Sequence, residues 1–373
     1  MKHRLVHLDF LRGIAAILVC ISHLSAFLFV PFKQAQSSGL LIKAFYFLST
    51  LGHQAVLLFF VLSGYLVGGS VIKSFQLKRW SWRDYLLRRM TRLWVVLIPA
   101  LLLTLFWDSM GSHLNPAGYM GDFHQVYGSG PELGQAIDLG GISFFGNLFF
   151  LQTISVPVYG SNFPLWSIAN EFWYYLLFPL ILSVFLIRGV MQKIVSMILV
   201  IAILVALPKL LIFQGLSWLL GAGIFFAQQR KVVNEFCSHP LFLFVAILFP
   251  LIVLLLIRFG IFWIFFDYLI PFSFAPLIAA CSVRTTREGI YSRCSVAASE
   301  VSYTLYLVHF PVMAFLFFSF LPGRQMVPGF LTGGVFCVIL GCILLYSVAI
   351  WWLFERNTDR IRKLFESRLS CPQ

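Results

Sequence analysis

The stretch LFLFVAILFPLIVLLLI, residues Leu241–Ile257, contains no charged side chain. Two further runs without charge, Leu93–Trp107 and Ile194–Leu207, have the same character. Apolar residues make up 60% of the chain and charged residues 11%, whereas a soluble domain carries about 25% charged residues. An α-helix that crosses a bilayer needs about 20 mostly apolar residues. These blocks, taken with their flanks, therefore predict helices that span a membrane.

We predict an all-α fold, a polytopic transmembrane bundle of about ten helices. Residues 1–354 would form the transmembrane domain and residues 355–373 a short basic tail. The predicted spans are Phe10–Val30, Leu51–Ile72, Leu93–Trp107, Phe163–Ile187, Ile194–Leu207, Leu210–Ala227, Leu241–Ile257, Ile261–Val283, Val301–Leu321 and Gly329–Phe354.

The basic residues predict the orientation of this bundle. With the N-terminus inside, the inner segments hold 21 of the 27 Lys and Arg residues and the outer segments hold 5, while Arg12 lies within a span. Such an excess of positive charge is typical of cytoplasmic loops, so both termini are expected in the cytoplasm. The net charge of +13 then comes mainly from residues that face the cytoplasm and anionic lipid. We therefore expect no nucleic-acid partner. Arg12 interrupts the first apolar run, which favours a retained span over a cleaved signal peptide.

The longest predicted loop, from Asp108 to Asn162, lies outside in this topology. Within it, Ile142–Val156 is apolar but short for a crossing, which suits a re-entrant or interfacial segment.

The inner stretch 73–92 combines seven Lys and Arg residues with interleaved aromatic residues. A belt of this kind anchors helices at the membrane surface, and this interpretation stays open. The alternative is a phosphate-binding cluster, because arginine binds phosphate through a two-pronged fork. Arg88, Arg89 and Arg92 stand at helical spacing, which favours their convergence on one anion.

The first span carries two ionisable residues, Arg12 and His23, and such residues inside a span are candidates for function. They are 11 residues apart, which leaves them about 20° from alignment on one helical face. Asp9 lies close to that face, one turn before Arg12. A histidine that only hydrogen-bonds a neighbouring helix is the structural alternative for His23.

Two later spans add polar residues. Counted from the span ends at about 1.5 Å per residue, Glu171 and His23 are expected at similar depth toward the outer side, and His309 nearer the middle. A carboxylate beside a buried imidazole raises the basicity of the ring. We therefore predict a polar path from the cytoplasmic side, with His23 and Glu171 as catalytic candidates. Its other members are Asp9, Arg12, Glu300, Ser302, Tyr303, Tyr306 and His309. No metal site is expected.

The chain lacks the sequence patterns of serine hydrolases, zinc proteases, P-loop ATPases and dinucleotide-binding enzymes. It resembles the acyltransferase 3 family of bacterial membrane proteins, which acylate sugars of cell-surface glycans. The resemblance covers nearly the whole chain and follows the order of the family. The pieces are LDFLRGIAAILVCISH (8–23), FFVLSGYL (59–66), LRRMTR (87–92), PLWSIANEFWYYLLFP (164–179), SYTLYLVHFP (302–311) and Glu355. Asn357 stands where the family often has proline.

The resemblance implies a membrane-bound O-acyltransferase of the bacterial inner membrane, with no bound cofactor. Its donor would be cytoplasmic acyl-CoA, most simply acetyl-CoA, held by Arg12, Arg88, Arg89 and Arg92. Its acceptor would be a lipid-linked or exported saccharide such as an O-antigen or exopolysaccharide. His23 would act as a general base or carry the acyl group itself. Two other functions stay open: a transporter or flippase of a glycan precursor, and a non-catalytic partner in polysaccharide assembly.

Overall fold

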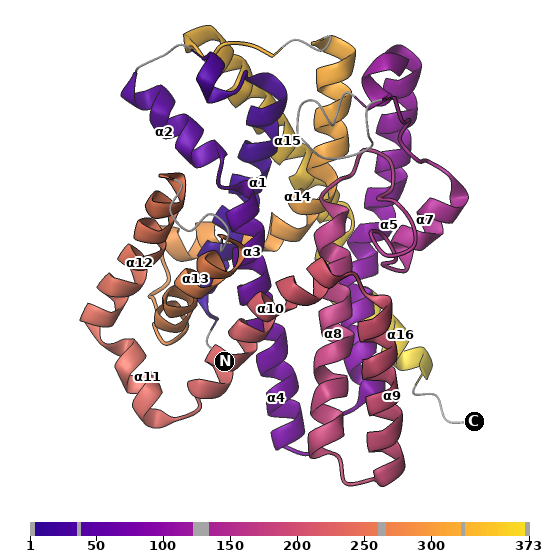
Figure 1. The fold of residues 1–373 in the computed structure, drawn as a ribbon, viewed down its shortest axis with the longest axis vertical. Helices are drawn as coiled ribbons and strands as arrows, with labels where there is room; N and C mark the ends of the chain where they lie inside the picture. Colours follow the sequence, from indigo (N-terminus) through magenta and orange to yellow (C-terminus); the bar gives the residue numbers. More distant parts are fainter. Residues whose placement is uncertain (1–3, 36–38, 122–133, 260–265, 322–324, 370–373) are drawn as a thin grey trace. The chain divides into compact units, whose positions relative to one another are not determined.

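The protein is helical throughout the part of the chain described by the computed structural model, residues 4–35, 39–121, 134–259, 266–321 and 325–369 (Figure 1). Helices account for 81% of it, and these ranges contain no strand. In lipid every backbone polar group needs an internal partner, and a helix supplies one within the segment. The long apolar runs accordingly form helices, which confirms the predicted all-α transmembrane class.

Eight helices within the described ranges are long and apolar enough to cross a membrane. Two more predicted spans correspond to α9, Val190–Ala206, and α13, Phe266–Ser282. Each has 17 residues, the lower end of the usual length for a crossing. Residues 261–265 of the predicted eighth span lie outside the described residues. The eight long helices are α1 (Val6–Leu28), the joined α3, η2 and α4 (Gly52–Gln76), α5 (Trp82–Leu114), α8 (Leu165–Leu186), α10 (Lys209–Ala227), α12 (Pro240–Arg258), α14 (Ile290–Phe320) and α15 (Phe330–Leu353).

Several boundaries differ from the sequence prediction. Helix α5 begins at Trp82, where Ser81 caps it by accepting a hydrogen bond from the Asp84 backbone N–H at 3.3 Å. The arginines at 88–92 therefore lie on the helix, as their spacing predicts, although the predicted span begins only at Leu93. Helix α14 begins at Ile290, so Glu300 lies inside it and not before it.

Two short helices lie between the predicted spans. Helix α2, Leu40–Ser49, follows the first span, and α7, Gly141–Leu148, occupies the start of the apolar piece 142–156. Eight residues of helix extend about 12 Å, less than half of a hydrocarbon core, so α7 does not cross. The predicted re-entrant or interfacial placement of this segment stays a prediction.

The chain divides into two compact units. Unit 1 comprises residues 1–15, 53–80 and 167–300, and unit 2 comprises residues 16–52, 81–166 and 301–373. Helices α1 and α14 each begin in unit 1 and end in unit 2. The prediction of one transmembrane domain with a short tail stays a prediction. Residues 355–357 form the short helix η5 and residues 358–369 form α16, which packs on α5 in unit 2.

Unit 1 is organised around the contact of η2, Gly64–Gly68, with α10. A Cβ atom on Gly64 would collide with the Trp218 carbonyl, and one on Gly221 would collide with the Val61 carbonyl. Small residues let two helix backbones approach closely in a membrane. The contact is fixed by Ser63, whose hydroxyl accepts from Trp218 Nε1 at 3.1 Å and lies 3.1 Å from the Tyr175 hydroxyl. The stretch FFVLSGYL thus has a packing role.

In unit 2 the end of α1 is paired with the segment that follows α14. The Met326 backbone N–H donates to the Leu28 carbonyl at 2.7 Å, and the Val30 N–H donates to the Met326 carbonyl at 3.1 Å. The Gln325 side chain donates to the Ala26 carbonyl at 2.7 Å. These bonds hold the last turn of α1 against the segment that begins at Gln325.

Candidate active site

Two histidines from distant parts of the sequence meet in unit 2. His23 lies on α1 and His309 on α14, and Nδ1 of His23 is 2.8 Å from Nε2 of His309. The His309 side chain is fully buried. Its Nδ1 atom lies 2.8 Å from the carbonyl oxygen of Leu305, one turn earlier on the same helix. The pair therefore forms a continuous hydrogen-bonded chain from a backbone carbonyl to His23.

The predicted difference in depth between His23 and His309 was wrong, because the two rings are in direct contact, 2.8 Å apart between ring nitrogens. The depth of His309 had been counted from Val301, but α14 begins 11 residues earlier, at Ile290. Because the helix extends past the apolar run, the start of that run was a poor origin for the count of depth.

Aromatic side chains contact both imidazoles of the pair, of which His309 is buried and His23 half-buried. The Phe310 ring meets His23 edge-on, with ring centroids 5.1 Å apart and planes at 83°. The Tyr306 ring centroid lies 6.1 Å from that of His309. Apolar rings exclude water, which strengthens hydrogen bonds among the groups that they surround.

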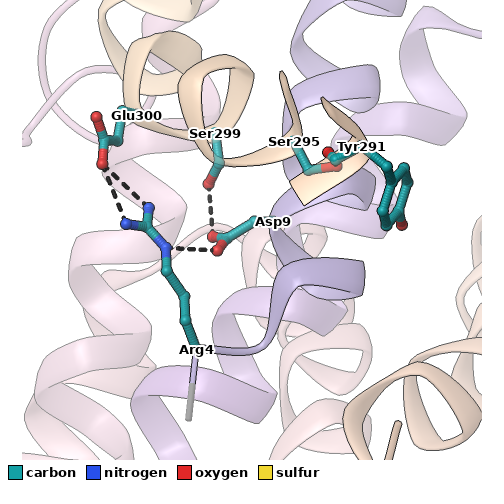
Figure 2. Close-up of polar contacts among 6 residues, drawn as sticks. All are labelled: Arg4, Asp9, Tyr291, Ser295, Ser299 and Glu300. Carbon is teal, nitrogen blue, oxygen red and sulfur yellow. Dashed lines mark hydrogen bonds and ion pairs between the residues drawn. The ribbon is translucent and has the colours of Figure 1, made fainter. Parts of the chain in front are cut away.

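In unit 1, a charged cluster joins the start of α1 to α14, and Figure 2 shows its members. Arg4 donates to Asp9 at 2.9 Å and to Glu300 at 3.1 and 3.2 Å, while the Ser299 hydroxyl donates to Asp9 at 2.8 Å. Burial lowers the pKa of the Arg4 guanidinium, but the hydrogen bonds and charges of Asp9 and Glu300 outweigh it, so that the net pKa is raised.

Close packing accompanies this cluster. A Cβ atom on Gly13 of α1 would lie 2.6 Å from the Ala298 Cβ atom of α14. Asp9 and Glu300, both predicted members of the polar path, are thus brought together through Arg4. Sequence reasoning missed Arg4 and Ser299, because the contacts of Ser299 with Asp9 and of Arg4 with Glu300 join residues 290 and 296 positions apart in the chain.

The arginine cluster lies on the second and third turns of α5. Arg88 and Arg92 are exposed, and Arg89 is half-buried with its guanidinium carbon 5.8 Å from the centre of the Tyr85 ring. An aromatic face attracts a guanidinium cation, so this contact restrains Arg89. Arg88 and Arg92, one turn apart, are the members of the cluster that face outward from the protein.

Other predicted site residues are placed as follows. Ser302 and Tyr306 are buried on α14, and the Tyr303 hydroxyl donates to the Leu93 carbonyl at 3.2 Å. Arg12 on α1 and Glu171 on α8 are half-buried in unit 1. The proximity of Glu171 to His23, and the polar path through both units, stay predictions.

Sequence reasoning also missed a buried polar cluster in unit 2. Asp108 on α5 is fully buried and accepts two hydrogen bonds from Ser161, at 2.6 Å from the backbone N–H and 2.7 Å from the hydroxyl. Asn162 donates to the Thr104 hydroxyl at 3.1 Å and to the Leu307 carbonyl at 2.9 Å. An acid directly after an apolar run was the available signal, but Asp108 was assigned to a loop.

A model of the acyltransferase 3 family, described as an acyltransferase domain, matches residues 5–347. The chain belongs to this family. No curated protein and no solved structure matches the chain significantly. The family region includes both histidines and the arginines of α5. Together with the eight helices of membrane-spanning length, the acyltransferase 3 assignment supports a multi-pass membrane acyltransferase. No cluster of three or more metal-ligating side chains occurs within the described ranges.

Proposed function

We propose that this member of the acyltransferase 3 family is an O-acyltransferase that moves an acyl group from acyl-CoA to a hydroxyl group of a saccharide. The saccharide oxygen forms a bond to the acyl carbon, and the bond from that carbon to the CoA sulfur breaks. The hydroxyl proton leaves the saccharide and finally protonates the CoA thiolate. The products are an acylated saccharide and free CoA.

The observation that carries this proposal is the hydrogen-bonded pair of His23 and His309 within the matched family region. A neutral imidazole is the side chain best suited to take a proton near neutral pH. The same ring nitrogen can instead accept the acyl group and pass it on. Both routes need His23 with an unprotonated ring nitrogen.

For the donor, we propose the arginines of α5 as the phosphate contacts. CoA carries a diphosphate, a further phosphate and an adenine ring. Arg88 and Arg92 are exposed and one helical turn apart, which suits two contacts to neighbouring phosphate oxygens. Trp82, on the first turn of the same helix, offers a face on which an adenine can stack.

For the acceptor, we propose a lipid-linked or exported saccharide at the inner membrane of a bacterium, such as an O-antigen or exopolysaccharide precursor. An acceptor tethered to lipid stays at the membrane, so that the enzyme does not need to collect it from water. Acetyl is the acyl group that we propose to test first.

The test is thiol release. Purified full-length protein in lipid nanodiscs is given acetyl-CoA labelled in the acetyl group, with and without lipid-linked saccharide extracted from the producing cells. We expect free CoA to appear, and label to enter the saccharide in equal amount. Movement of saccharide across a vesicle membrane without CoA release would identify a flippase instead. Neither activity, from protein shown to be inserted and folded, would favour a non-catalytic partner in polysaccharide assembly.

A further inference from the structure

The hydrogen bonds of His309 determine which of its ring nitrogens carries the proton. The Leu305 carbonyl oxygen can only accept, so Nδ1 of His309 must donate across the 2.8 Å contact. His309 is fully buried, and burial penalises a charged ring. In the neutral ring only one nitrogen is protonated, so Nε2 of His309 is an acceptor.

The same reasoning then applies to His23. Nδ1 of His23 lies 2.8 Å from the acceptor Nε2 of His309, so Nδ1 of His23 must carry a proton and donate it. Because a neutral imidazole carries one proton, Nε2 of His23 is the nitrogen with the lone pair. In free histidine the proton lies mainly on Nε2, so His23 is held in the form that is less populated in water.

The geometry of the two rings supports a strong hydrogen bond. Their planes differ by 5° and their centroids are 5.1 Å apart. That separation is close to the 2.8 Å contact plus the centroid-to-nitrogen distance in each ring. Both nitrogens therefore lie near the line between the ring centres, and the rings are side by side in one plane. The N–H bond of His23 points along the lone pair of His309, the preferred alignment.

We propose that His309 is a positioning residue that holds His23 in the tautomer protonated at Nδ1, so that Nε2 presents the reactive lone pair. The tautomer follows from the contacts of His309, and its use in acyl transfer rests on the proposed function. When Nε2 takes the proton of the saccharide hydroxyl, His23 becomes positively charged. Its Nδ1–H group still donates to the neutral acceptor on His309, which stabilises this charge. Nε2 then gives its proton to the CoA thiolate, and the pair is restored.

The test reads the tautomer directly. Full-length protein labelled with ¹⁵N-histidine is studied in lipid nanodiscs at neutral pH by solid-state NMR, where the ¹⁵N shift separates protonated from unprotonated ring nitrogens. The chain has eight histidines, so the signals of the pair are assigned by their loss in His23→Gln and His309→Gln. We expect both rings to be protonated at Nδ1 in the unmodified protein.

Two variants then separate positioning from packing. His309→Phe keeps a ring but removes the acceptor, so His23 should move its proton toward Nε2. His309→Gln keeps an oxygen acceptor, so His23 should stay protonated at Nδ1. The packing control is Phe317→Leu, a buried change on α14 about two helical turns beyond His309 and beside Phe27. It should leave the tautomer unchanged.

Kinetics supply the second readout. A general base contributes roughly 10²–10⁴-fold to the rate. His309→Phe should therefore lower kcat about 10²-fold with KM little changed. His309→Gln should lower kcat less than about tenfold, because it keeps an acceptor for His23. A wild-type His23 protonated at Nε2, or an unchanged tautomer in His309→Phe, overturns the proposal. If His309→Phe fails to insert, the wild-type and His309→Gln spectra decide alone. The expected tautomer in a protein that transfers no acyl group would refute the proposed function and leave the positioning role intact.

Discussion

The carboxylate of Glu355 accepts two hydrogen bonds from Thr304, at 3.2 Å from the backbone N–H and 2.5 Å from the hydroxyl. Thr304 is fully buried on α14, and Glu355 begins η5 directly after α15. Both residues belong to unit 2, where this contact ties the end of α15 to the helix that carries His309. We infer a structural role for Glu355.

Glu355→Ala should therefore destabilise the protein. It leaves the buried Thr304 hydroxyl without this acceptor, and an unsatisfied buried group costs about 1–3 kcal/mol. The measurement is the Tm of purified protein in detergent at a fixed scan rate. As a control, Glu235→Ala removes the partner of Lys231 at 3.7 Å, a pair in which both side chains are exposed and which should contribute little. Equal Tm values for the two variants would refute the structural role.

Packing of η2 against α10 gives a second prediction. Gly64→Ala places a Cβ atom against the Trp218 carbonyl, and backbone atoms cannot move aside as a flexible side chain does. We expect less folded protein in the membrane, measured as the monodisperse fraction after extraction. Gly223→Ala, on the same α10 helix with nothing within 4 Å of the added atom, is the matched control and should extract normally. The interpretation fails if both variants extract alike.

Orientation in the membrane is the third prediction. Reporter fusions after Lys78, Arg230 and Arg287 should report cytoplasm, because these positions lie among the segments rich in Lys and Arg. A fusion after Gly121 should report the outer side. A cytoplasmic signal at Gly121 would reverse the assignment of the long segment between α5 and α8, and with it the side of every later loop.

Hydropathy predicted most of the long helices because it is a local property. The run Leu241–Ile257 contains within itself the reason why it forms α12. Short elements were harder to predict for the same reason. Helix α2, with ten residues, was not predicted, and α7, with eight, lies in an apolar piece that was predicted only as a re-entrant or interfacial segment. Helix ends were also missed where polar residues continue a span, as at Ile290.

Contacts between residues far apart in the chain could not be predicted from the sequence. Residue types and helical spacing identified His23 and His309 as separate candidates, but these residues are 286 positions apart and nothing local indicates that they touch. Asp108 and Ser161 are 53 positions apart, and their contact is likewise a property of tertiary packing. The sequence predicts which polar residues lie in apolar surroundings, whereas their partners emerge only from the fold.

Donor binding is the fourth prediction. Arg88→Ala and Arg92→Ala should each raise the KM for acyl-CoA, because a phosphate contact is lost from the bound substrate and the transition state alike. Lysine at either position should restore binding only in part if the contact uses two guanidinium nitrogens. Arg230→Ala, a loss of cationic charge outside the cluster, is the control. KM values that match this control would reduce the cluster to a membrane anchor.

The role of His23 is the central claim. His23→Gln retains a polar side chain of similar reach but cannot take a proton at neutral pH, and it cannot carry an acyl group. Loss of a general base typically lowers the rate about 10²–10⁴-fold. Glu171→Gln should have a smaller effect if Glu171 only orients or polarises the ring.

The most direct measurement is saccharide acylation per unit of membrane-inserted protein, compared between the wild type, His23→Gln and His23→Ala. A structural histidine predicts that the glutamine variant stays active and that the alanine variant loses activity only in proportion to lost protein. We predict instead that both variants insert normally and that both lose at least about 10²-fold of their specific activity. Near-normal specific activity in His23→Gln would contradict the account.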